Sequence, residues 1–266
     1  MQSVPTAQHP AQHPAEQPAL QLALRNASRS FGSVHAVDRV SLVCARGAFT
    51  ALVGPSGCGK TTILRLLAGL DAPDGGSCDR PTQGGLATGF LFQEPRLLAW
   101  RTVRENVALP LELAGIGRDE RLARADEALR LVRLSDASSR FPHQLSGGMK
   151  MRASLARAIV ARPTLLFLDE PFGALDEVTR HELDMELRAL WERERFTAVL
   201  VTHSLPEAAF LAERMVVFSP RPARIVADIA TPDGARDARF WTSDALGACV
   251  RTGSEAMLRA IEEARR

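Results

Sequence analysis

Residues 54–61 read GPSGCGKT, a glycine-rich segment whose composition and spacing suit the binding of a nucleoside triphosphate. Its glycines let backbone N–H groups turn inward around phosphate oxygens. Lys60 would place its ammonium group on the β- and γ-phosphates, and the hydroxyl of Thr61 would ligate Mg²⁺. The run FTALV leads into this phosphate loop and a segment of helical period leads out, which is the context that the motif requires. A plain glycine-rich turn is the weaker interpretation.

A second group of chemically active residues stands at 165–171, LLFLDEP, where an apolar run ends in two carboxylates. Ligands bind at the carboxyl edge of a parallel sheet, so Asp169 would meet the Mg²⁺ shell beside Thr61. Glu170 would be free to orient or deprotonate a water that attacks the γ-phosphate. Strands often end in acids, so this pattern gains its meaning from the phosphate loop. Together the two segments predict a nucleoside triphosphatase.

The segment LSGGMKMR at 145–152 precedes a run of helical period. Ser146 has the character of an N-cap, and Gly147 and Gly148 would let a backbone approach an anion at the helix end. A simple N-cap followed by flexible glycines explains the same residues. Because the chain already has one phosphate cradle, a second anion site would serve another ligand or another subunit.

These segments must be positioned by an α/β fold, because strand-like and helix-like runs alternate along the chain. Several strand-like runs are continuously apolar, as in a parallel sheet covered on both faces. Strands are predicted at 36–44, 48–53, 89–93, 165–169, 197–202 and 214–218. Helices are predicted at 60–69, 102–114, 118–133, 147–161, 177–194 and 204–213. The stretch 94–161 contains helices alone and is predicted to be a helical subdomain inserted between two strands.

Composition sets the boundaries of the α/β domain at 20–235. Residues 1–19 are rich in Pro, Gln, His and Ala without apolar period, which predicts a disordered tail, and 236–266 predicts a short helical extension. The net charge of +2 does not call for nucleic acid as a partner. There is no apolar run long enough to span a membrane, and the four cysteines lie far apart, which favours a reducing compartment.

The motifs together resemble those of the ATP-binding cassette (ABC) ATPases. GPSGCGKT, Gln93, LSGGM, LLFLDEP, ALD at 174–176 and His203 occur in the order and spacing of that family, and the resemblance covers about residues 20–220. It implies a P-loop NTPase with a mostly parallel sheet, flanking helices, a small antiparallel β subdomain and an inserted α-helical subdomain. It also implies ATP and Mg²⁺ as ligands, and a head-to-tail dimer of two cassettes, most simply a homodimer.

The resemblance also assigns roles to individual residues. Ser146, Gly147 and Gly148 would serve the partner's nucleotide, and Asp176 would cross the dimer interface. The catalytic residues implied are Glu170, His203 as the γ-phosphate switch, and Gln93, which would link metal and water to the transporter contact. The implied Mg²⁺ residues are Thr61, Gln93 and Asp169, and the implied ATP-binding residues are Phe31, Gly54, Pro55, Ser56, Gly57, Cys58, Gly59, Lys60, Thr61 and Thr62.

The sequence departs from the family pattern at three places. Phe31 stands where the family usually has a tyrosine stacked on adenine, and its ring keeps the π-face. Met149 replaces the commoner glutamine of the signature. The stretch between Asp71 and Gly89 is short, so the antiparallel subdomain is expected to be small.

Residues 92–113, FQEPRLLAWRTVRENVALPLEL, resemble the importer cassettes of the nitrate, sulfonate and taurine group. Leu97, Leu98 and Trp100 would form an apolar patch that receives a helix of a separate membrane permease; for Leu97, capping of the subdomain's own core is an equal alternative. The resemblance implies a peripheral protein on the cytoplasmic face of the inner membrane, working with a solute-binding protein. Nitrate, sulfonates, taurine and thiamine precursors all suit it as cargo.

Other ABC classes fit the sequence less well. ABC ATPases that act on nucleic acid insert long coiled coils, which are not visible here, and translation factors of the superfamily carry two cassettes. A non-hydrolysing regulatory module is the remaining alternative. The presence of Lys60, Asp169, Glu170 and His203 favours hydrolysis.

Overall fold

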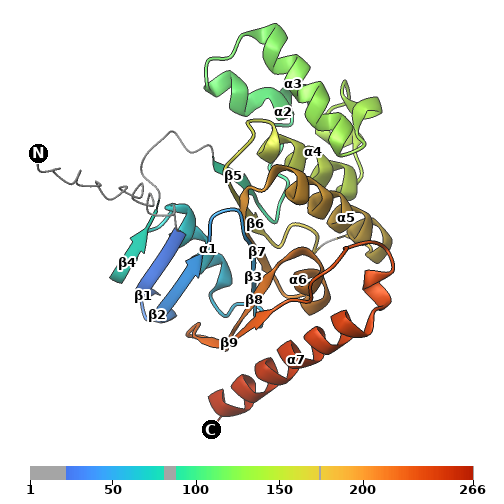
Figure 1. Cartoon of the computed structure of the whole chain (residues 1–266). Helices are drawn as coiled ribbons and strands as arrows, with labels where there is room; N and C mark the ends of the chain where they lie inside the picture. Colours follow the sequence, from blue (N-terminus) through green and yellow to red (C-terminus); the bar gives the residue numbers. More distant parts are fainter. Residues whose placement is uncertain (1–21, 81–87, 174, 266) are drawn as a thin grey trace, which may run out of the picture.

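The structure is a computed structural model that describes residues 22–80, 88–173 and 175–265. The tail predicted for 1–19 and Ala174 of the ALD segment lie outside the described residues. Two sheets lie side by side with helix α1 (Lys60–Ala68) packed against both, and a group of helices projects from one end of the larger sheet (Figure 1).

The larger sheet has six strands in the order β5-β6-β7-β3-β8-β9. Its first five strands are parallel, and β9 pairs antiparallel with β8. This confirms a mostly parallel sheet. The strands span Thr88–Leu91 (β5), Leu165–Asp169 (β6), Thr197–Thr202 (β7), Phe49–Val53 (β3), Arg214–Phe218 (β8) and Ile225–Ala230 (β9).

The central strands are apolar throughout because both faces of the sheet are covered. On β3, Phe49, Ala51 and Val53 face one apolar core, while Leu52 faces the other. The first core contains helices α5 (Glu177–Glu194) and α6 (Leu205–Leu211), and the second contains α1 and the smaller sheet.

The smaller sheet is antiparallel, in the order β2-β1-β4, with β1 at Leu22–Phe31, β2 at Val34–Cys44 and β4 at Gly75–Asp79. The small antiparallel subdomain is thus confirmed. The run predicted at 36–44 belongs to this sheet rather than to the parallel one. Strands β1, β4 and β9 were not predicted, because polar residues interrupt β1, β4 reads GGSCD, and β9 is a half-buried edge strand.

The inserted helical subdomain is confirmed and consists of α2 (Val103–Leu113), α3 (Arg118–Leu131) and α4 (Gly147–Ile159), with two short 3-10 turns at Ser135–Ala137 and Pro142–Gln144. Helix α2 begins with a capping box formed by Thr102 and Glu105. The three helices pack against one another and against the core beneath α5.

The end of the chain forms a 3-10 turn at Phe240–Thr242 and helix α7 (Asp244–Ala264). Helix α7 packs on α6, β8 and β9, and a Cβ atom at Gly253 would lie 2.8 Å from a methyl carbon of Leu205. Trp241 stacks between His181 of α5 and Phe210 of α6. No helix in the described ranges is long and apolar enough to cross a membrane.

Candidate nucleotide-binding site

The phosphate loop joins the carboxyl end of β3 to the start of α1. Gly59 has a φ of 123°, and a Cβ atom there would lie 2.5 Å from the carbonyl oxygen of Ala36. Only glycine can hold this conformation so close to neighbouring backbone. The loop is therefore fixed in shape by its contact with β2.

Lys60 is only 4% exposed at the first position of α1. Its ammonium group donates hydrogen bonds to the carbonyl oxygens of Gly54, at 2.8 Å, and Pro55, at 2.9 Å. The charge therefore lies within the loop, where it can meet the phosphates of a bound nucleotide.

Thr61 and Asp169 are brought together across the sheet edge, with the Thr61 hydroxyl donating to Oδ1 of Asp169 at 2.9 Å. Burial raises the pKa of the Asp169 carboxyl, and the hydrogen bond from Thr61 opposes that rise. A desolvated carboxylate beside a hydroxyl suits Mg²⁺, which prefers oxygen ligands. Among the described residues no three His, Cys, Asp or Glu side chains form a metal cluster.

Glu170 and His203 meet at the same edge, where they follow β6 and β7. Oε2 of Glu170 lies 3.2 Å from Nδ1 of His203. Glu170 adopts a left-handed φ of 44°, and its backbone N–H donates to Val201 at 2.8 Å. A left-handed backbone is strained for a residue other than glycine, and such strain often occurs at functional sites.

A cavity of about 240 Å³ lies between these elements. Phe31, at the end of β1, is 48% exposed and stands at one wall, while Glu170 stands at another. The lining residues are Phe31, Val34, Ala36, Gly57, Gly59, Lys60, Thr61, Thr62, Glu170 and Arg221.

The signature segment (residues 145–149) lies on a different surface. The Ser146 hydroxyl accepts a hydrogen bond from the N–H of Met149 at 3.3 Å, and so caps α4. Asp176 caps α5 by accepting from the N–H of Thr179 at 3.0 Å. Both capping residues, with Gly147 and Gly148, line a second cavity of about 430 Å³. Of the described residues, none lines both cavities.

The ABC transporter family matches residues 37–173, more than half of the chain. The chain belongs to this family. The taurine import ATP-binding protein of Rhizobium johnstonii is 43% identical over 208 residues, which is 76% of this chain and 78% of that protein. An aliphatic sulfonates import ATP-binding protein of Mesorhizobium japonicum is 47% identical over 206 residues, or 77% of each chain.

Solved structures agree with the sequence comparisons. A bacterial ABC transporter cassette solved as a dimer superposes with a TM-score of 0.72 at 29% identity, over 80% of this chain and all of that one. A post-hydrolysis dimer of an ATP-binding cassette with ADP and phosphate bound gives a TM-score of 0.71 at 29% identity, with the same coverage. The ATPase predicted from the motifs is thus confirmed.

Not every predicted site residue of the cassette lines the nucleotide cavity. Gln93 is exposed just beyond β5 and contributes nothing to the described wall. Gly54, Pro55 and Ser56 belong to the loop, and Asp169 and His203 to the sheet edge, but none of these five residues lines the cavity. Cys58 is buried beneath the loop, and this burial raises the pKa of its thiol.

Three residues of the cavity wall, Val34, Ala36 and Arg221, were not predicted from the sequence, and Arg221 is the charged one. Arg221 follows β8 in the segment SPRPAR, far along the chain from the phosphate loop. Its Nε and Nη2 atoms donate to the carbonyl oxygen of Gly57, at 3.0 and 2.6 Å. The pairing of β8 with β3 and the hydrogen bonds of Ala223 to β2 bring the two segments together.

Proposed function

We propose that this cassette is the ATP-hydrolysing subunit of an importer for small sulfonates or related solutes. The observation that carries the proposal is the set of Lys60, Thr61–Asp169 and Glu170–His203 at one sheet edge. The names of the relatives, which import taurine and aliphatic sulfonates, support this class of cargo. Nitrate and thiamine precursors are further members of the expected range.

The residues at this edge divide the chemistry among them. The amides of the phosphate loop and the ammonium of Lys60 hold the phosphates of ATP. Thr61, Asp169 and, as the family resemblance implies, Gln93 would hold Mg²⁺, which when bound would neutralise charge on the transferred phosphoryl group. The carboxylate of Glu170 accepts a proton from the attacking water. His203 would orient that carboxylate through its contact at 3.2 Å and, as the family resemblance implies, would contact the γ-phosphate.

Two copies of the chain complete each site. The signature surface, with Ser146, Gly147, Gly148 and Asp176, presents two capped helix ends to solvent. These helix ends favour an anion. In a head-to-tail dimer each copy would supply them to the nucleotide held by the other copy's phosphate loop. The cassette structure solved as a dimer supports the pairing of two copies.

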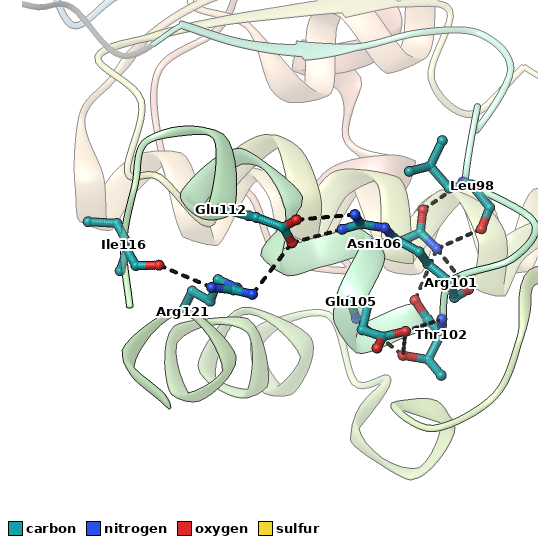
Figure 2. Close-up of polar contacts among 8 residues, drawn as sticks. All are labelled: Leu98, Arg101, Thr102, Glu105, Asn106, Glu112, Ile116 and Arg121. Atoms are coloured by element: carbon teal, nitrogen blue, oxygen red, sulfur yellow. Dashed lines mark hydrogen bonds and ion pairs between the residues drawn. The ribbon is translucent and has the colours of Figure 1, made fainter. Parts of the chain in front are cut away.

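The permease would dock on the helical subdomain, where one buried side chain fixes the loop before α2 (Figure 2). Asn106 is fully buried. Its Oδ1 accepts from the N–H of Leu98 at 2.7 Å, and its Nδ2 donates to the carbonyl oxygens of Leu98, Arg101 and Thr102 at 3.0–3.1 Å. Arg101 also pairs with Glu112 at 2.8 Å. The loop is thereby held rigid.

This rigid loop displays Trp100, which is 74% exposed beside a cleft of about 310 Å³. Leu97 instead packs partly buried against the large core, so capping of that core explains it. Trp100 is the residue of the predicted apolar patch most open to a permease helix. The proposed complex would be peripheral, on the cytoplasmic face of the inner membrane, and would include a solute-binding protein.

A Glu170→Gln variant tests the hydrolytic role. ATP binding should persist while phosphate release is lost and a closed dimer accumulates, because the attacking water loses its base. Glu194→Gln, at the far end of α5, is the matched control and should keep wild-type turnover. An unchanged turnover in Glu170→Gln would refute the role.

A second variant tests permease docking. Trp100→Ala should uncouple solute uptake in vesicles from ATP hydrolysis while basal ATPase activity of the isolated cassette stays unchanged. Leu113→Ala removes an equally exposed side chain outside the cleft and should leave uptake intact. Normal uptake by Trp100→Ala would place the docking site elsewhere.

A further inference from the structure

The loop between β8 and β9 is fastened to β2 beside the phosphate loop. The N–H of Ala223 donates to the carbonyl oxygen of Ala36 at 2.9 Å, and the N–H of Asp38 donates to the carbonyl oxygen of Ala223 at 3.1 Å. Ala36 is also the residue against which Gly59 is packed. The backbone that carries Arg221 is therefore held at a fixed distance from the nucleotide cavity.

The guanidinium of Arg221 lies directly on the phosphate loop. It donates twice to the carbonyl oxygen of Gly57, and its Nη2 would lie 3.3 Å from a Cβ atom at that glycine. Gly57 has a φ of 71°, so a side chain there would be strained as well as crowded. At this point the cavity wall is bare backbone, and the Arg221 side chain lies against it.

The charge of Arg221 is not neutralised by any carboxylate in the described part of the chain. Arg224, three residues later in the same loop, forms an ion pair with Asp38 at 2.7 Å. Among the described residues, the hydrogen-bond partner of Arg221 is one neutral carbonyl, and Lys60 donates to two other carbonyls of the loop, those of Gly54 and Pro55. Two cations thus lie on carbonyls of the phosphate loop, and both line the same cavity.

We propose that Arg221 is a further nucleotide-binding residue, whose guanidinium contacts the polyphosphate of ATP. The inference rests on the nucleotide site described above. A guanidinium binds phosphate oxygens through several N–H groups and keeps its charge at every physiological pH. Since no acid competes for it among the described residues, the nucleotide would supply the missing negative charge.

The test separates contact with phosphate from support of the loop. Competition against a fluorescent ATP analogue would give the affinities of the full chain for ATP, ADP and AMP, at low and high salt. Arg221→Gln keeps a donor for Gly57 but loses the charge. We expect at least about tenfold weaker binding of ATP and ADP. AMP affinity should change less, and the salt dependence of ATP binding should shrink because a charge contact is lost.

Two further variants control the measurement. Arg224→Gln removes a charge from the same loop outside the cavity and should leave all three affinities unchanged. Arg221→Lys should recover most of the ATP affinity. Melting curves establish that each variant is folded.

Two results would overturn the proposal. Wild-type ATP affinity in Arg221→Gln would show that the charge is not used. An equal loss for AMP and ATP, with unchanged salt dependence, would show that Arg221 only supports the loop or contacts the base. Failure of the wild-type chain to bind ATP would instead refute the nucleotide site itself.

Discussion

The two glycine-rich segments of the cassette differ in what surrounds them. A Cβ atom at Gly59 in the phosphate loop would lie 2.5 Å from the backbone of Ala36, whereas one at Gly147 in the signature segment would meet no atom of the described residues within 4 Å. The first glycine is required by packing within the chain. The second faces space that the described residues do not fill.

The neighbouring residues follow the same division. Lys60 and Asp169 are buried, and their polar atoms are paired within one chain. Ser146 and Gly147 are exposed at the start of α4. One half of the ATP site is therefore completed by the fold of a single chain. The other half is a surface, consistent with the proposed use by a second copy.

The largest effect is expected from Lys60→Met, which keeps the apolar stem but removes the ammonium group from the buried half. ATP binding by the isolated chain should be lost, and phosphate release should fall by about a thousandfold, because the charge on the phosphates is no longer balanced. Isothermal titration and a phosphate-release assay measure both. Activity within tenfold of the wild type would contradict the assignment of Lys60.

Gly147→Glu adds a negative charge to the exposed half and leaves the buried half intact. The new side chain points into open space, and an acid in the first turn of a helix is favourable, so the fold should be kept. ATP binding by the isolated chain should persist. Hydrolysis should fall by about a hundredfold, because a carboxylate would face the partner's nucleotide.

The control for this variant is Gly117→Glu, at the start of α3, where a Cβ atom also meets nothing within 4 Å. Hydrolysis should be unaffected there. If Gly147→Glu retained full activity as well, the signature surface would not take part in catalysis, and the proposed dimer would need another geometry.

The same division separates what the sequence could predict from what it could not. The phosphate loop, the acidic strand and the helical subdomain follow from local patterns, since each depends on neighbours a few residues away. Strand β9 and Arg221 depend on contacts between distant segments. Arg221 reaches Gly57 across 164 positions of the chain, and an arginine between two prolines has no spacing that indicates a ligand.

The stability of the chain should also respond differently to alanine at the two glycines. Gly59→Ala places a methyl group against the Ala36 carbonyl at a φ of 123°, and should lower the free energy of unfolding by about 2–4 kcal/mol. Gly147→Ala should leave it unchanged or slightly raise it. Urea denaturation measures both. Equal stability of the two variants would mean that the phosphate loop accommodates the methyl group at Gly59 at no cost in free energy.

The two halves also differ in the direction in which the pKa values of their acidic residues are shifted. Glu207 and Asp184 are buried, and burial raises the pKa of Glu207 to about 7 and that of Asp184 well above its ordinary value. The charge of Glu207 adds to the rise for Asp184, the charge of Glu170 adds to the rise for Glu207, and Arg180 opposes both. In the exposed half, hydrogen bonds from Thr179 lower the pKa of the Asp176 carboxyl.

These shifts have opposite consequences for stability. The folded chain keeps a proton on Glu207 that the unfolded chain releases above about pH 4.5, so stability should fall as the pH rises from 5.5 to 7.5, by about 1–2 kcal/mol. Glu207→Gln stays neutral and should make this slope shallower in urea denaturation, while Asp184 keeps its own contribution. Asp176→Asn should not, because Asp176 titrates below this range and stabilises the fold only above its own lowered pKa. If the pH dependence of stability were unchanged in Glu207→Gln and absent in Asp176→Asn, it would arise from Asp176 in the exposed half instead.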